Sequence, residues 1–425
     1  MRAAPAASRG SRLMQRLDAL ARFSSDGPER LTRLYLTPEH RAATAQIGIW
    51  MREAGLAVAM DAAGTLTGRL EGASPDAPVL LLGSHIDSVR NAGKYDGNLG
   101  VLVAIEAVGR LQAGGKAMPF AIEVLAFGDE EGVRFPVTLA GSRALAGSFD
   151  PASLDCTDAD GTSLRDALRA FGCDPAAIPA IARDRTKTLG FIEVHIEQGP
   201  VLEEKGLALG IVTAISGASR LAITVTGMAG HAGTVPMHLR RDAGVAAAQM
   251  LLAAERIAAT RGDIVATVGQ LSLEPGAVNV IPGEAGFTLD VRSPLDAARR
   301  DGLAEITGAF EDIARQRGVA VCCRPFYDAT AAACDPALMQ GLENTLLAHG
   351  IAPFRLASGA GHDGLAMAAL CPIAMLFVRC KNGISHNPAE SVEEGDIELA
   401  TEMVQDFLAH FDPLSFRASH LGETA

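Results

Sequence analysis

The chain has 425 residues, of which 48% are hydrophobic and 20% are charged, and its formal net charge is −13. This length suits two domains rather than one core, and the negative charge argues against nucleic acids and anionic membranes as partners, because both are negatively charged. The seven cysteines are irregularly spaced, and no apolar run approaches the roughly 20 residues that span a bilayer. These features predict a reduced, cytoplasmic protein.

The first half of the chain is predicted to alternate strands and helices. Met1–Arg12 lacks the apolar stretch of a signal peptide and is predicted to be a disordered tail. Apolar periodicity then predicts two helices between Ser11 and Gly55, strands at Thr65–Leu70, Val79–Leu82, Phe120–Phe127 and Leu189–Ile196, and a helix at Asn98–Gly114. Such alternation indicates an α/β fold with a mostly parallel sheet, whose site lies beyond the carboxyl ends of its strands.

An insert of α+β character is predicted at residues 214–328. Its expected elements are the strands Leu221–Thr226, Ile264–Val268, Gly286–Val291 and Val319–Cys323 and the helices Arg241–Thr260 and Ala297–Arg317. The α/β character returns with the helix Pro336–His349, the strand Ile373–Val378 and a helix near Ile397–Phe411. We therefore predict a discontinuous catalytic domain at residues 1–213 and 329–425.

Side chains that can ligate a metal follow several of the predicted strands. They are His85, Asp96, Glu131, His195 and His386. Three imidazoles and two carboxylates suit two divalent ions, either Zn or Mn, with Co or Ni also possible, and Asp96 is the natural bridge between them. Two such ions would polarise a substrate carbonyl and activate a water molecule.

The adjacent Glu130 is predicted to be the general base, which deprotonates the water and passes the proton to the leaving nitrogen. Taken singly, each motif has a simpler interpretation. Asp129-Glu130-Glu131 is typical of a solvated loop, His195 of a packed core histidine, and His386 of a polar loop. The five candidate ligands together favour a metal site.

The motifs resemble those of the M20-type metallopeptidase superfamily. They are His85-x-Asp87, Gly93-Lys94-Tyr95-Asp96-Gly97, Glu130-Glu131-Gly132-x-Arg134-Phe135, His195-Ile196-Glu197-Gln198-Gly199 and Gly230-His231-Ala232-Gly233-Thr234-x-Pro236-Met237. More narrowly, the motifs and their order resemble those of the amidase, or hydantoinase/carbamoylase, branch of this superfamily. This branch contains allantoate amidohydrolases, N-carbamoyl-L-amino-acid hydrolases and β-ureidopropionases. The resemblance implies a zinc-peptidase-like catalytic domain with an inserted lid, which also forms a homodimer.

The resemblance also implies roles for individual residues. One ion would be held by His85, Asp96 and His195, and the other by Asp96, Glu131 and His386, while Asp87 would orient His85. His231 would reach the partner subunit's site and stabilise the oxyanion. The residues that would bind a small substrate are Gln198, Arg220, His231, Asn279 and Arg292, and all of these except His231 match positions that bind its ureido and carboxylate groups. Without the motif context, Arg292 would be interpreted as a surface arginine.

Allantoate is the first substrate prediction, because Arg90–Asp96 and Ser358–Asp363 are similar to bacterial allantoate amidohydrolases. Its hydrolysis would release ammonia and CO2. N-carbamoyl-L-amino acids and β-ureidopropionate are the alternative substrates. A dipeptidase or aminoacylase-like enzyme is disfavoured by His195, where many peptidases of the superfamily use a carboxylate. A non-catalytic metal-binding protein is disfavoured by Glu130, because a purely structural site has no use for an unligated carboxylate.

Overall fold

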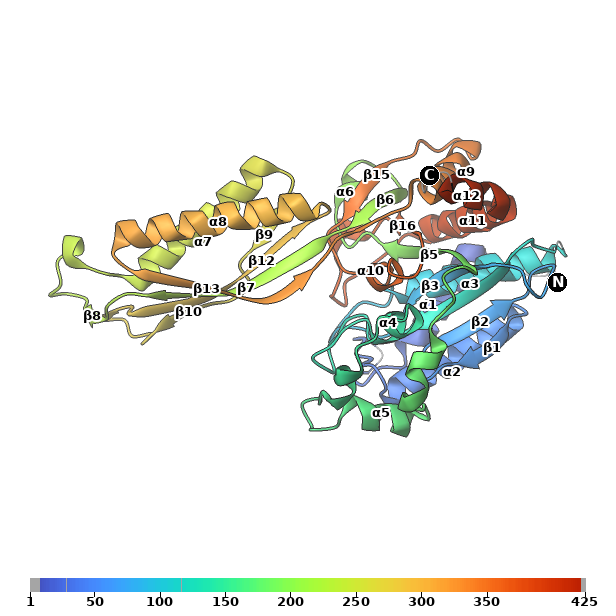
Figure 1. Cartoon of the computed structure of the whole chain (residues 1–425), viewed down its shortest axis with the longest axis horizontal. Helices are drawn as coiled ribbons and strands as arrows, with labels where there is room; N and C mark the ends of the chain where they lie inside the picture. The colour runs from blue at the N-terminus through green and yellow to red at the C-terminus, as the bar shows by residue number, and fades with distance from the viewer. Residues whose placement is uncertain (1–7, 28, 116, 422–425) are drawn as a thin grey trace, which may run out of the picture. The chain divides into compact units, whose positions relative to one another are not determined.

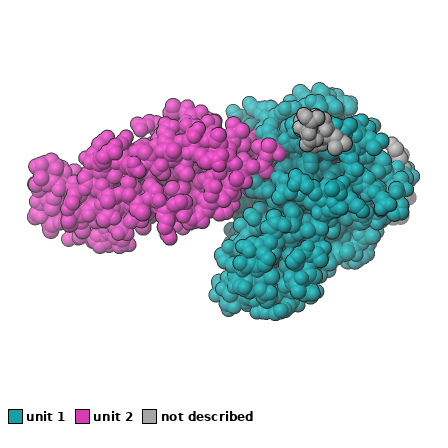
Figure 2. All heavy atoms as spheres, in the orientation of Figure 1, with its two compact units in different colours: residues 1–213, 334–356, 362–425 teal, residues 214–333, 357–361 magenta. Residues whose placement is uncertain are grey.

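The computed structural model describes residues 8–27, 29–115 and 117–421. Two compact units divide the chain (Figure 2). Unit 1 comprises the chain up to Thr213, Cys334–Leu356 and the part from His362, whereas unit 2 comprises Ala214–Ala333 and Ala357–Gly361. The predicted insert begins where unit 2 begins, but unit 2 extends five residues past the predicted end at 328 and also includes Ala357–Gly361.

A nine-stranded sheet forms the centre of unit 1 (Figure 1). Its strands are β1 (Ala57–Met60), β2 (Leu66–Leu70), β3 (Val79–His85), β4 (Ala121–Phe127), β5 (Thr188–Ile196), β6 (Leu209–Ile215), β14 (Ala332–Ala333), β15 (Arg355–Ser358) and β16 (Ile373–Val378). They follow the order β1-β2-β4-β3-β5-β16-β6-β14, with β15 also paired to β6.

Only the centre of this sheet is parallel. The neighbouring strands β4, β3, β5 and β16 pair in parallel, whereas β1, β2, β6 and β14 pair antiparallel. The predicted mostly parallel sheet is therefore confined to four strands. The residues of β3, β4, β5 and β16 are all buried, which explains why they appear in the sequence as continuous apolar runs.

Unit 1 also contains helices. They are α1 (Arg9–Ala21), α2 (Pro38–Glu53), α3 (Asn98–Ala113), α4 (Ala140–Leu145), α5 (Leu164–Phe171), α6 (Val201–Glu204), α9 (Pro336–Ala348), α10 (Gly364–Met367), α11 (Glu394–His410) and α12 (Pro413–Leu421). Helix α3 packs on β3, β4 and β5, and α11 packs on α3. Because α1 begins at Arg9, the predicted disordered tail is wrong for residues 9–12, while residues 1–7 lie outside the described residues.

Unit 2 is a second sheet covered on one face by two long helices (Figure 1). The sheet has the order β10-β12-β7-β13, with β9 also paired to β12, and β8 and β11 form a separate pair. The elements are β7 (Gly217–Thr226), β8 (Gly230–His231), α7 (Ala243–Arg261), β9 (Val265–Thr267), β10 (Leu271–Glu274), β11 (Val280–Ile281), β12 (Glu284–Ser293), α8 (Asp296–Arg317) and β13 (Ala320–Ala329).

The two faces of this second sheet differ. Along β12 buried and partly exposed residues alternate strictly, which is the period of a strand covered on one face. Leu289 and Val291 pack with Met250 of α7 and Phe310 of α8 in the core of unit 2. Strands β8, β10 and β11 have no counterpart in the sequence prediction, because β10 is exposed throughout and the other two are only two residues long. Among the described residues, no helix is both long and apolar enough to cross a bilayer.

Candidate metal centre

The predicted metal ligands of unit 1 converge at one edge of the sheet. His85 ends β3 and His195 lies near the end of β5, while Glu131 follows β4 and His386 follows β16. Since these four strands are parallel neighbours, their carboxyl ends meet at the same edge. Asp96 enters from the loop before α3.

Their donor atoms lie close enough together to hold ions. Three sets of side chains each bring one donor atom within 4.8 Å of the others: His85, Asp96 and His195; Asp96, Glu131 and His386; and His85, Glu130 and Glu131. Asp96 belongs to the first two sets, as a bridging carboxylate must. His195 Nε2 lies 3.1 Å from Asp96 Oδ1, and His386 Nε2 lies 3.4 Å from Asp96 Oδ2.

The hydrogen bonds at Nδ1 of the two buried imidazoles, His85 and His195, are those expected of histidines that ligate a metal through Nε2. Nδ1 of His85 is 3.0 Å from the main-chain oxygen of Asp87, and Nδ1 of His195 is 2.9 Å from that of Ile196. If both Nδ1 atoms donate, each neutral ring keeps a lone pair on Nε2, and the two Nε2 atoms lie 3.5 Å apart and face Asp96. Nε2 of His195 also accepts the N–H of Gly97 at 3.3 Å. Oε1 of Glu131 is buried without a hydrogen-bond partner, so it also offers a lone pair to this space. The side chains present therefore fit two divalent cations.

Asp87 contacts His85 through its main chain rather than through its side chain. Its carboxylate, predicted to orient His85, is 3.7 Å from the ring, whereas its main-chain oxygen is the hydrogen-bond partner. The carboxylate instead accepts the backbone N–H groups of Glu130 and Glu131, at 3.1 and 3.2 Å. Asp87 thus holds the turn that carries the predicted base and ligand.

Backbone conformation and one glycine shape this edge further. Asp129, Gln198 and His386 all adopt φ between 54° and 69°, a left-handed region that costs non-glycine residues energy and is concentrated at functional sites. Gly97 also has a positive φ of 64°, and a Cβ there would lie 2.5 Å from Nε2 of His85. Only glycine lets the Asp96 loop approach this imidazole.

The charges of the cluster compensate one another. Burial alone would raise the pKa of Asp96, but hydrogen bonds from His195, His386 and His85 hold it well below its ordinary value. Burial, with Asp96 nearby, raises the pKa of Glu131 to about 7, and the Asp96 hydrogen bond raises the pKa of His386 to about 8. Burial raises the pKa of Glu130 well above its ordinary value, opposed by His85 and reinforced by Glu131. The metal-free centre therefore holds protons that cations would displace.

Gln198 is the predicted substrate-binding residue that lies in unit 1 at this centre. Its Nε2 donates to Asp96 Oδ2 at 2.8 Å and lies 3.5 Å from Nε2 of His386.

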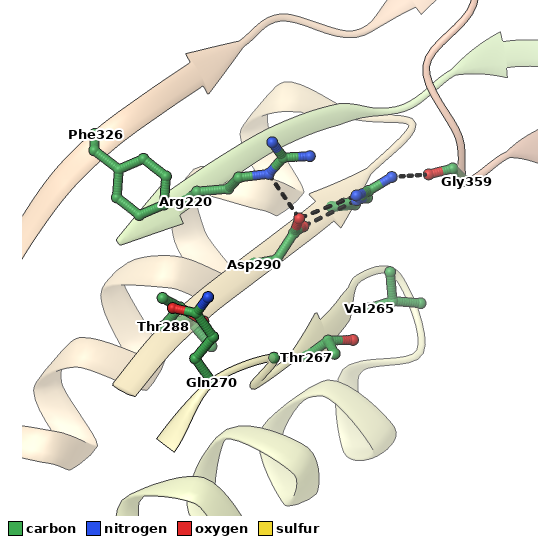
Figure 3. Close-up of a pocket in the computed structure, with 11 residues that line it drawn as sticks. Arg220, Val265, Thr267, Gln270, Thr288, Asp290, Phe326 and Gly359 are labelled. Carbon is green, nitrogen blue, oxygen red and sulfur yellow. Dashed lines mark hydrogen bonds and ion pairs between the residues drawn. The ribbon is translucent and has the colours of Figure 1, made fainter. Parts of the chain in front are cut away.

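The other four lie in unit 2 and form two groups. In the first, Nε of Arg220 donates to Asp290 Oδ2 at 2.9 Å, and Arg292 donates to both oxygens of the same carboxylate, at 2.9 and 3.0 Å (Figure 3). Burial would raise the pKa of Asp290, but the two arginines lower it. These side chains line a cavity of about 850 Å³, which Thr288 and Phe326 also line.

The second group is His231 with Asn279, where β8 pairs with β11. The N–H of Ala232 donates to the main-chain oxygen of Asn279 at 3.0 Å. His231 is exposed, and its Nδ1 accepts the N–H of Gly233 at 3.0 Å, so the neutral ring carries its hydrogen on Nε2.

Sequence reasoning missed Asp290 and Glu390. The carboxylate of Asp290 accepts hydrogen bonds from the guanidinium of Arg292. The carboxylate of Glu390 accepts hydrogen bonds from two backbone N–H groups of the Asp96 loop. Asp290 stands two residues before Arg292 on the same strand, so the period of a strand places both on one face and could have indicated the pair. For Glu390, four residues after His386, the local sequence contains no comparable signal.

Three imidazoles and two carboxylates at the carboxyl edge of four parallel strands fit a metal site of the kind that metal-dependent hydrolases use. A sequence profile of peptidase family M20/M25/M40 matches residues 81–410. The chain belongs to this family and is a hydrolase of non-peptide C–N bonds.

Individual relatives agree with this class. An N-carbamoyl-L-amino acid amidohydrolase of Geobacillus stearothermophilus is 44% identical over 93% of this chain and 97% of its own length. An allantoate deiminase of Arabidopsis thaliana is 38% identical over 90% of this chain and 79% of its own length. The crystal structure of an amidase of the hydantoinase/carbamoylase family from Burkholderia multivorans superimposes with a TM-score of 0.88 at 32% identity, covering 94% of this chain and 97% of the other. The chain is therefore similar to amidohydrolases of ureido C–N bonds.

Proposed function

We propose that the protein hydrolyses the carbamoyl group of N-carbamoyl-L-amino acids, so that one substrate and one water give the free amino acid, ammonia and CO2. The observation that carries the reaction class is the convergence of donor atoms around Asp96, with Glu130 beside them. The choice of substrate is supported by the 44% identity to a carbamoyl-amino-acid amidohydrolase.

Allantoate is the second candidate, although sequence analysis placed it first. It is supported by the stretches Arg90–Asp96 and Ser358–Asp363 and by the 38% identity to an allantoate deiminase. Both compounds present a carboxylate and a terminal ureido group, so the same residues would serve either substrate.

The site is proposed to hold two divalent ions, one at His85, Asp96 and His195 and the other at Asp96, Glu131 and His386. This assignment is supported by the two donor sets that share Asp96 and by the Nδ1 hydrogen bonds, which leave the Nε2 atoms of the neutral rings with lone pairs. When bound, two ions of the Zn or Mn type would supply the Lewis acidity that polarises the ureido carbonyl and acidifies water.

Glu130 is the proposed general base. It takes a proton from the attacking water, and it returns that proton to the nitrogen as the C–N bond breaks. The turn held by Asp87 supports this role, because the two N–H bonds fix the backbone that carries Glu130. His231 is the proposed oxyanion donor, and its neutral ring with hydrogen on Nε2 suits that role.

Substrate recognition is assigned to the polar groups on unit 2 and to Gln198. The planar guanidinium groups of Arg220 and Arg292 would bind the substrate carboxylate. This is supported by the position of both arginines in the lining of one cavity, where Asp290 accepts hydrogen bonds from both. Asn279 and Gln198 would bind the ureido group through their amides.

Unit 2 is proposed to be the lid and dimerisation domain, with His231 acting in the partner subunit's site. In the described part of the chain, strand β13 is paired on one side, to β7. An edge strand of this kind can pair with a second copy. Light scattering on the purified protein measures the mass, and a monomer at assay concentration would contradict this assignment.

The first experiment compares ammonia release from Mn-reconstituted protein with N-carbamoyl-L-amino acids, allantoate, β-ureidopropionate and dipeptides. Turnover that is fastest with the carbamoyl amino acids supports the proposal. Ammonia mainly from allantoate would move the protein to the second candidate and leave the site unchanged. Cleavage of the dipeptides alone, followed by free amino groups, would contradict both.

A further inference from the structure

Glu390 joins two loops that are far apart in the sequence. It is 5% exposed, and its Oε1 accepts two consecutive backbone N–H groups, from Tyr95 at 2.8 Å and from Asp96 at 3.1 Å. Its Oε2 lies 3.1 Å from Oγ of Ser385. One buried carboxylate therefore connects the loop of Asp96 to the loop that carries His386.

Both ends of this connection are tightly packed. Gly93 is buried against Glu390, and a Cβ at Gly93 would lie 2.3 Å from the Cβ of Glu390. On the other side, the N–H of Glu390 donates to the main-chain oxygen of Asn387 at 3.0 Å, which closes the turn after His386. The side chain of Glu390 thus lies against the backbone of Gly93 at one end, and its own backbone N–H fixes the turn after His386 at the other.

Ser385 extends the connection to the bridging carboxylate itself. Its hydroxyl lies 2.8 Å from Asp96 Oδ2 as well as 3.1 Å from Glu390 Oε2. A hydroxyl has one hydrogen and can donate to one of these oxygens at a time. If Asp96 Oδ2 binds another group, the Ser385 hydroxyl can donate to Glu390 instead. Glu390 would then still join the loop of Ser385 to the loop of Asp96 through its own hydrogen bonds.

We propose that Glu390 is a positioning residue that sets the spacing between Asp96 and His386, and hence the affinity for the ion these two share with Glu131. The inference rests on the proposed two-ion site. Residues that support metal ligands in this way typically change metal affinity or activity by 10- to 100-fold when they are replaced, which is the magnitude expected here.

The test compares Glu390→Ala, Glu390→Gln and Glu390→Asp with Glu398→Ala, a control on helix α11. Mn²⁺ or Zn²⁺ alone is titrated calorimetrically into the metal-free full chain, and kcat and KM are then measured over a range of metal concentrations. We expect Glu390→Ala to weaken the binding of one of the two ions about 10- to 100-fold. We expect Glu398→Ala to bind both ions with the affinity of the wild-type protein. Glu390→Gln should restore most of the affinity, because its amide oxygen can accept the two N–H groups and its NH2 can donate to Ser385.

Activity should follow metal occupancy. In Glu390→Ala, kcat should fall at limiting metal and recover at excess metal, with KM unchanged, which a general loss of structure would not produce. A folded Glu390→Ala protein that binds both ions as tightly as wild type would overturn the inference. If that variant does not fold, Glu390→Asp decides, since a shorter side chain cannot reach both loops and wild-type affinity in it would equally overturn the inference. Wild-type protein that binds two ions but hydrolyses no ureido compound would contradict the proposed function alone.

Discussion

The metal centre of unit 1 and the polar face of unit 2 are built in opposite ways. At the centre, His85 and His195 are 1% exposed and Asp96 is 3% exposed, and each is held by hydrogen bonds from strand ends or loops. On the face of unit 2, the side chains of Arg220 and Arg292 are 40% and 30% exposed and are held mainly by Asp290.

The proposed function assigns bond cleavage to the first group of residues and substrate recognition to the second. Buried ligands on a rigid sheet keep the geometry that bond cleavage needs, whereas exposed cations on a separate scaffold remain available to a carboxylate from solvent. Chemistry and recognition should therefore be separable by mutation. The following predictions test that separation, beginning with the largest expected effect.

Glu130→Gln should lower kcat by about 100- to 10,000-fold, because the amide cannot take the proton from water. Metal content should not change, since neither proposed ion site uses Glu130. Steady-state kinetics and elemental analysis of the same preparation measure the two quantities. Turnover near that of wild type would show that the base lies elsewhere.

His231→Ala should lower kcat by about 100-fold through loss of an oxyanion donor, again with full metal content. This variant tests whether a residue of unit 2 takes part in the chemistry. Loss of metal from it would move His231 from the oxyanion role to the ligand set, and the division between the units would then fail.

Arg292→Lys should raise KM for a carboxylate substrate by about 10-fold and leave kcat and metal content unchanged, because lysine keeps the charge but loses the planar pair of donors. Arg324→Lys, on the exposed part of β13, is the matched control. A change in kcat with constant KM would assign Arg292 to the reaction itself.

The smallest expected effect is the pH dependence of the metal-free protein. Folding raises the pKa of Glu131 from 4.5 to about 7 and that of His386 from 6.5 to about 8. Both groups bind a proton more tightly when folded, so their stabilisation is complete below the unfolded values and is lost as pH rises through the folded ones. The melting temperature should therefore fall between about pH 5 and 8.

Bound metal should flatten this slope, because the cations replace the protons. Differential scanning fluorimetry with and without Mn²⁺ measures both curves. A melting temperature that rises over this range without metal would contradict the linkage.

Much of unit 1 could be predicted from the sequence. Buried parallel strands appear as continuous apolar runs, so β3, β4, β5 and β16 can be recognised in the sequence, and the candidate ligands stand at or after their carboxyl ends. Strand β10 could not be found in this way, since every residue in it is exposed and the pattern is absent.

The sequence by itself determined which donor types stand at the strand ends and in which motifs, because these depend on local order along the chain. Tertiary structure alone decided which atoms meet. In the folded chain, Nδ1 of His85 lies at a main-chain oxygen, and the carboxylate of Asp87 accepts the N–H of Glu130. The carboxylate of Glu390 accepts the N–H of Asp96. Hydrogen bonds act over about 3 Å in space, whereas the residues that they join here can stand 294 positions apart in the chain. No local pattern records such a pairing.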